Sequence, residues 1–266
     1  MSDKLVIPRI GNAAGTCKTE RHFELLLQSA ADVITIGPIT LHPREYNPGN
    51  NEYQNNTGGS INSHGLPSEG KTYYRKHLPE FLRMAEDFGK LVSVSLPPID
   101  KVEGSERDDI EIVTAMCLDA GVRIIEMNAG CGNVWKGSKQ KRILSFQPEA
   151  LEHMIDKLLG IIRRAAVHAE LRVKLSPYSD PVLLAEIASM LFTRNVAVVT
   201  SNTFANAYMF REDIDHRPAI EFGKHLGGYG GKGMKPIALG QVAQFREYLP
   251  DHKIIGASGI ENGRDM

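Results

Sequence analysis

The stretch VRIIEMNAGCGNVW, residues 122–135, joins a short apolar run to a loop rich in glycine and asparagine. Short β-branched runs of this kind are typical of buried strands in a parallel sheet. Similar runs recur along the chain at Val33–Ile36, Leu91–Leu96, Leu171–Leu175, Val196–Thr200 and Lys253–Ala257. A further strand is expected near Arg9–Ala13, which gives seven strands in all.

Segments with apolar residues at helical spacing separate these runs: Glu20–Ala30, Tyr74–Phe88, Asp108–Ala120, Pro148–Ala169, Pro181–Thr193 and Pro236–Leu249. Repeated strand-then-helix order predicts an α/β fold with a parallel sheet. A length of 266 residues suits one TIM (β/α)8 barrel, so the prediction is a single barrel domain over residues 1–266. Ile260–Met266 resembles the start of a helix after the seventh strand. The eighth strand is missing, and we expect a barrel truncated after the seventh strand and incomplete at the C-terminus.

Charge and composition favour a small-molecule ligand. The chain carries 31 basic and 32 acidic residues, a net charge of −1, so nucleic acid is not an expected partner. It shows neither a signal-peptide pattern nor an apolar run of membrane-spanning length, and a cytoplasmic protein without membrane attachment is expected. Three scattered cysteines do not fit a disulfide framework or a zinc site, and no metal is predicted.

Three connections that follow strands are unusually long: residues 37–71, 128–147 and 201–235. In such a barrel they lie at the C-terminal face, where the chemistry takes place. In the middle one Cys131 stands between Gly130 and Gly132, which suits close approach of a ligand to an exposed thiol. Read alone, Cys131 fits either an inert loop cysteine or a reactive one.

Several segments, in this order, resemble the dihydroorotate dehydrogenase family. They are NAAGTC (12–17), TLHPREYNPGN (40–50), SINSHGLPSEGKTYY (60–74), EMNAGCGNVW (126–135), VKLSPY (173–178), SNT (201–203), GGYGGKGMKP (227–236) and IIGASGIENGRD (254–265). The loop cysteine is most similar to class 1A enzymes, whereas class 2 enzymes use serine. The resemblance implies a flavoprotein oxidoreductase that binds FMN and oxidises dihydroorotate to orotate in pyrimidine biosynthesis. It further implies a homodimer, with fumarate as one candidate electron acceptor.

The resemblance also implies a role for each matching residue. Cys131 would take a proton from C5 of dihydroorotate while hydride leaves C6 for flavin N5. Substrate-binding residues would be Asn62, Gly65, Leu66, Asn128, Asn133, Asn202 and Thr203. Cofactor-binding residues would be Ala14, Gly15, Lys174, Gly230, Gly231, Gly256, Ser258 and Gly259, with the Lys174 ammonium stabilising negative charge on the reduced ring.

One departure from the family pattern leaves other functions open. The second strand of the family normally ends in a lysine that contacts flavin and orotate, but Ile36 and Gly37 stand there, unless Lys18 or His64 supplies the charge. Loss of this cation suggests another FMN-dependent barrel oxidoreductase, acting on a different dihydropyrimidine or an activated alkene. Two further alternatives are an aldolase-type barrel with a Schiff base on Lys174 and a catalytically silent fragment whose seven units do not close. Whatever the function, the missing eighth strand predicts weak retention of FMN.

Overall fold

The main element of the fold is a curled, six-stranded parallel sheet. The computed structural model describes residues 9–99, 108–214, 217–262 and 265. The strands follow the order β1-β4-β5-β8-β9-β12. Their bounds are β1 Val33–Ile36, β4 Leu91–Leu96, β5 Ile124–Asn128, β8 Glu170–Leu175, β9 Ala197–Thr200 and β12 Ile254–Gly256. Because neighbours in this order pair in parallel, all their carboxyl ends lie at one edge of the sheet.

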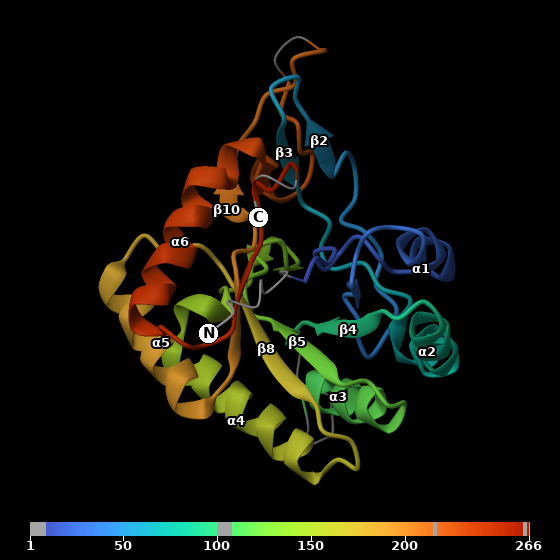
Figure 1. The fold of residues 1–266 in the computed structure, drawn as a ribbon. Coiled ribbons are helices and arrows are strands. Elements are labelled where there is room, and N and C mark those ends of the chain that lie inside the picture. The colour runs from blue at the N-terminus through green and yellow to red at the C-terminus, as the bar shows by residue number, and fades with distance from the viewer. Residues whose placement is uncertain (1–8, 100–107, 215–216, 263–264, 266) are drawn as a thin grey trace.

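Helices cover the outer side of this sheet (Figure 1). They are α1 Glu20–Leu27, α2 Gly70–Asp87, α3 Asp109–Asp119, α4 Pro148–Arg164, α5 Pro181–Arg194 and α6 Lys235–Tyr248. Side-chain caps fix some of their starts, as where Asp180 accepts hydrogen bonds from the amides of Val182 and Leu183 at α5. No helix in these described ranges is long and apolar enough to cross a membrane.

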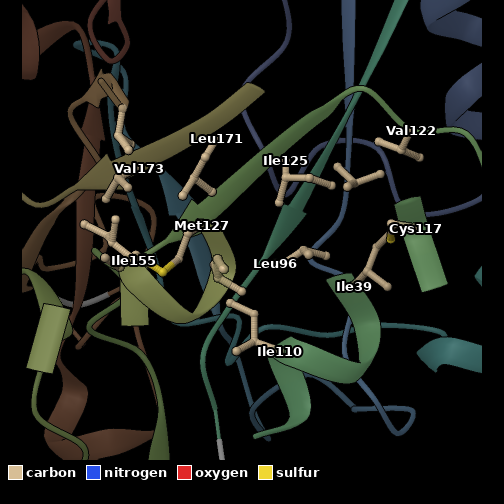
Figure 2. Close-up of a cluster of buried hydrophobic side chains, with 14 of the residues drawn as sticks. Ile39, Leu96, Ile110, Cys117, Val122, Ile125, Met127, Ile155, Leu171 and Val173 are labelled. Atoms are coloured by element: carbon tan, nitrogen blue, oxygen red, sulfur yellow. The ribbon is translucent and has the colours of Figure 1, made fainter. Parts of the chain in front are cut away.

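The two faces of the sheet differ in chemistry. Alternate strand residues such as Ile125, Met127 and Val173 pack against the helices, where they meet Ile110 of α3 and Ile155 of α4 (Figure 2). Side chains on successive strand residues point to opposite faces. The intervening buried residues, which therefore face the inside of the curl, are mostly polar: Thr35, Ser93, Ser95, Glu126, Asn128, Arg172 and Lys174. A polar inner face next to the strand ends suits a site for a polar ligand.

This arrangement confirms the predicted barrel class. The six later strands and all six helices lie where they were expected, with ends shifted by up to a few residues. The expected strand near Arg9–Ala13 is reduced to one parallel bridge between Gly11 and Val33. The helix expected at Ile260–Met266 is absent from residues 260–262, and most of the remainder lies outside the described residues. Within the described ranges the sheet forms part of a barrel, with β1 and β12 as its outer strands.

The three long connections contain regular structure of their own, which the sequence reading missed. A second, antiparallel sheet has the order β10-β11-β3-β2, with β10 Phe204–Ala207, β11 Gly227–Gly231, β3 Gly59–Asn62 and β2 Glu52–Gln54. The expected glycine loop at 227–231 is thus a strand paired with β3. The middle connection holds a hairpin, β6 Trp135–Lys136 and β7 Lys139–Gln140. Short 3-10 turns occur at Leu144–Phe146, Gly223–His225 and Lys232–Met234.

Candidate active site

Three strand ends bring together the first predicted substrate residues. Asn128 ends β5 and is the register partner of Lys174 on β8. Just beyond β9, the Asn202 side chain donates to Asn128 Oδ1 at 3.1 Å, and its backbone amide donates to Leu175 O at 2.7 Å. Parallel pairing therefore places two amide side chains and one ammonium at neighbouring positions.

A second amide cluster joins the first and middle connections. Asn133 Nδ2 donates to Asn62 O at 2.9 Å, so the residue two places after Cys131 contacts the end of β3. Asn47 reinforces this junction because its Nδ2 lies 2.9 Å from Ser63 O and 3.2 Å from Asn133 O. Asn62 and Asn133 thus belong to one hydrogen-bonded unit.

Gly65 and Leu66 lie beside this unit with consecutive positive φ angles of 79° and 63°. A Cβ on Gly65 would overlap the Asn47 side chain, so glycine is needed there. Both residues are buried, and their amide groups make no recorded hydrogen bond to any described residue. Buried N–H groups without partners are costly, and a bound anion would satisfy them.

Cys131 is half-buried rather than fully exposed, a correction to the exposed loop thiol expected from sequence. Burial raises the pKa of the thiol, while the backbone N–H of Asn133 and the positive charges of Lys174 and Arg44 act in the opposite direction. Asn133 of the second cluster and Lys174, the register partner of Asn128, thus both favour the thiolate of Cys131. Cys17 and Cys117 are fully buried core residues, so Cys17 does not reach a ligand.

Lys174 is only 5% exposed. Its ammonium makes no recorded hydrogen bond or ion pair with the part of the chain that the structure describes. A buried cation without a counter-charge is unfavourable unless a ligand compensates it. Lys174 therefore fits a site for an electron-rich ligand group.

The predicted cofactor residues fall into several places. Gly256 ends β12, and the amides of Ser258 and Gly259 just after it have no recorded partner among described residues. Gly230 and Gly231 lie on β11, and Gly230 is close to Thr203, whose amide donates to Asn202 Oδ1. The predicted pair Ala14 and Gly15 adjoins the end of β1, because Gly15 N donates to Gly37 O. Free amides after β12 and the Lys174 ammonium suit a phosphorylated flavin such as FMN.

The end of β1 has no residue that could replace the family lysine. Ile36 is fully buried on the helix-facing side of the strand. Gly37 has a φ of 131°, and a Cβ there would lie 2.6 Å from Ser95 O. Lys18 lies close by instead, because Cys17 O accepts a hydrogen bond from Gly37 N. His64 contacts Glu52 at 2.8 Å and is not a free cation.

Sequence reasoning missed Arg44, Tyr46 and Asn47, although all three lie in the TLHPREYNPGN segment that carried the resemblance. Arg44 Nη2 donates to Gly65 O at 3.3 Å, and its Nε is buried without a partner among described residues. No signal in a single sequence distinguishes these from ordinary loop residues, since an asparagine beside a proline usually indicates a turn.

Comparison with known proteins gives a consistent result. The family model described as "Dihydroorotate dehydrogenase" matches residues 5–266. A "Putative dihydroorotate dehydrogenase A (fumarate)" of Streptococcus uberis is 31% identical over 258 residues, covering 96% of this chain and 76% of that relative. The "Dihydroorotate dehydrogenase (fumarate)" of Saccharomyces cerevisiae is 29% identical over 269 residues, with the same coverage.

The fold also matches a solved structure, a dihydroorotate dehydrogenase of Eimeria tenella crystallised with ferulenol. The TM-score is 0.74 at 18% sequence identity, over 96% of this chain and 71% of that chain. The match of the family model over nearly the whole length, together with these relatives, shows that the chain belongs to the dihydroorotate dehydrogenase family.

Proposed function

We propose that this protein oxidises dihydroorotate to orotate in pyrimidine biosynthesis, with Cys131 as the catalytic base. The observation that carries the proposal is the position of Cys131. Its loop packs closely on Asn202, since a Cβ on Gly130 would lie 3.0 Å from Asn202 Cβ, and the loop is bonded through Asn133 to Asn62. Family membership and the fumarate-type relatives support the same reaction.

Cys131 acts on the proton at C5 of the substrate. In the resting protein the thiol is protonated at neutral pH, because burial raises its pKa. The basic form is the thiolate, which Lys174 and Arg44 stabilise through their charges. Asn62, Asn128, Asn133 and Asn202 would hold the ring, since amide side chains can both donate to and accept from its carbonyl and N–H groups. Thr203 would border the same position.

The substrate carboxylate would be held by the amides of Gly65 and Leu66 and by the Lys18 ammonium. Lys18 follows Cys17, whose carbonyl accepts a hydrogen bond from Gly37 N at the end of β1, so Lys18 would supply the charge that Ile36 and Gly37 do not. The proposal thereby accounts for the missing lysine without requiring another substrate.

FMN would be held by Lys174 and by Ala14, Gly15, Gly230, Gly231, Gly256, Ser258 and Gly259. When bound, it supplies the acceptor for the hydride from C6. Lys174 would hold positive charge beside the ring and favour its reduced form. We further propose fumarate as electron acceptor, a homodimer as the assembly and the cytoplasm as the location, on the basis of the fumarate-type relatives.

The test is anaerobic addition of dihydroorotate to the FMN-loaded protein, followed by the loss of flavin absorbance. Rapid bleaching that fumarate reverses is the expected result. A flavin that stays oxidised with dihydroorotate while another dihydropyrimidine bleaches it would contradict the substrate assignment. Trapping of Lys174 by borohydride with a carbonyl compound would instead support the aldolase alternative.

A further inference from the structure

Lys18 has an unusual environment for a surface-loop lysine. It is 9% exposed, and with Lys174 it is one of only two lysines that are buried in the described part of the chain. No ion pair of Lys18 is recorded among the described residues. Its main chain is fixed because Lys18 O accepts a hydrogen bond from the buried Tyr74 hydroxyl at 2.9 Å. An ammonium held this way must be stabilised by something other than a carboxylate.

Tyr46 provides that stabilisation. Lys18 Nζ donates to Tyr46 Oη at 2.8 Å and lies 4.6 Å from the centroid of the same ring. A phenol and a π-face both attract a cation without cancelling its charge, whereas a carboxylate would neutralise it. The pair therefore keeps a positive charge in place and available to an anionic ligand.

The Tyr46 ring is itself held in place. It packs edge-on against the His64 ring with 5.3 Å between centroids, and His64 Nε2 lies 2.8 Å from Glu52 Oε2. Burial lowers the pKa of His64, with Glu52 acting in the opposite direction and Lys18 in the same one, so the imidazole is neutral at pH 7. Lys18 is thus the cation of this cluster.

Backbone pairing brings the cluster beside the proposed carboxylate site. Residues 44–47 run antiparallel to residues 64–68, with Arg44 N donating to Ser68 O at 2.8 Å and Asn47 N donating to His64 O at 3.0 Å. Gly65 and Leu66 lie within the paired segment. Because Gly65 directly follows His64, and the His64 ring packs on the tyrosine that binds Lys18, these free amides and the Lys18 ammonium belong to one contiguous group.

We infer that Tyr46 is a positioning residue that holds the Lys18 ammonium at the carboxylate end of the substrate site and so determines selectivity for an anionic dihydropyrimidine. This inference rests on the proposed function. It assigns Tyr46 a role that is exerted through Lys18.

The experiment measures binding to the FMN-loaded oxidised protein by the change in flavin absorbance. The ligands are orotate and its uncharged amide, orotamide, which has nearly the same shape. Tyr46→Phe removes a hydrogen bond to a charged group and should weaken orotate binding about tenfold. Tyr46→Leu also removes the ring and should weaken orotate binding about threefold further. Orotamide binding should change less than about twofold in both variants.

A double-mutant comparison separates positioning from a general structural effect. Lys18→Met should lose most of the preference for orotate over orotamide, and adding Tyr46→Phe to it should have no further effect. Tyr248→Phe is the matched control, because Tyr46 and Tyr248 are both 47% exposed but Tyr248 lies at the end of α6. It should bind orotate like the wild type.

Three outcomes would overturn the inference. In the first, Tyr46→Phe binds orotate like the wild type while dihydroorotate still bleaches the flavin; only the role of Tyr46 is then wrong. In the second, orotate and orotamide weaken equally, which shows a structural role. In the third, the wild type neither binds orotate nor is reduced by dihydroorotate, which overturns the proposed function together with this inference.

Discussion

Replacement of Cys131 by alanine gives the most direct test of the catalytic assignment. A positioned general base contributes about 10²–10⁴-fold to the rate, or roughly 3–5 kcal/mol of transition-state stabilisation. We expect Cys131→Ala to slow anaerobic flavin reduction by dihydroorotate by that factor. Retention of FMN should not change, because the cysteine loop joins the substrate asparagines rather than the residues after β12. Stopped-flow absorbance at saturating dihydroorotate gives the rate.

The pH dependence of the same rate has a defined sign. Burial raises the pKa of the Cys131 thiol, so the thiolate fraction at neutral pH is smaller than for a free cysteine. The wild-type rate should therefore climb about tenfold per pH unit and level off above the ordinary thiol pKa. Cys117→Ala is the control; it changes a fully buried core residue and should keep a wild-type rate with reduced stability. Wild-type reduction kinetics in Cys131→Ala would refute the assignment.

Other substitutions test the remaining features. Lys174→Met should lower the flavin reduction potential and slow flavin reduction at least about tenfold, because a buried positive charge beside the reduced ring is lost. An unchanged potential in a redox titration would remove Lys174 from the site. Ile36→Lys and Gly37→Lys should each lower the free energy of unfolding in urea by about 3 kcal/mol or more. Lysine at 36 would bury a charge among core residues, and lysine at 37 would place a side chain against Ser95 O. Tighter orotate binding by either folded variant would contradict this geometry. Gly65→Ala should weaken orotate binding about tenfold with FMN retained, and unchanged binding would exclude the Gly65 amide as a ligand group.

Much of the fold could be predicted because its determinants are local. Runs such as Leu91–Leu96 and Leu171–Leu175 are strands in the structure, since each needs only burial on both faces to be recognised. The antiparallel sheet could not be predicted in this way. Its strands β3 and β11 are far apart in the sequence, and β11 consists of four glycines and one tyrosine, a composition typical of loops.

The candidate site was partly predictable for a related reason. Asn128 ends β5, and Cys131 and Asn202 lie shortly after β5 and β9, so the fold class alone places them at one edge of the sheet. The position of Lys18 depends instead on a hydrogen bond from Gly37 N to the carbonyl of its neighbour Cys17, which no periodicity reveals. Neither position 36 nor position 37 offers a lysine side chain a path to the ligand in this geometry. Ile36 faces the helices, and the backbone at Gly37 leaves no space for a side chain.

The antiparallel sheet makes one part of the C-terminal face of the barrel stiffer than the rest. Strand β3 of the first connection and β11 of the third are paired over four residues, although they are far apart in the sequence. The first and third connections therefore form two walls of the site that are joined into one stiff unit. The middle connection, which carries Cys131, is attached to that unit by side-chain hydrogen bonds, including those of Gln140 Nε2 to Asn206 Oδ1 at 2.7 Å and of Asn133 Nδ2 to Asn62 O at 2.9 Å. Breaking a few side-chain bonds costs less than separating a backbone ladder. The cysteine wall is therefore the part of the site that can move at the lowest cost, whereas the two walls joined by the backbone ladder keep their shape.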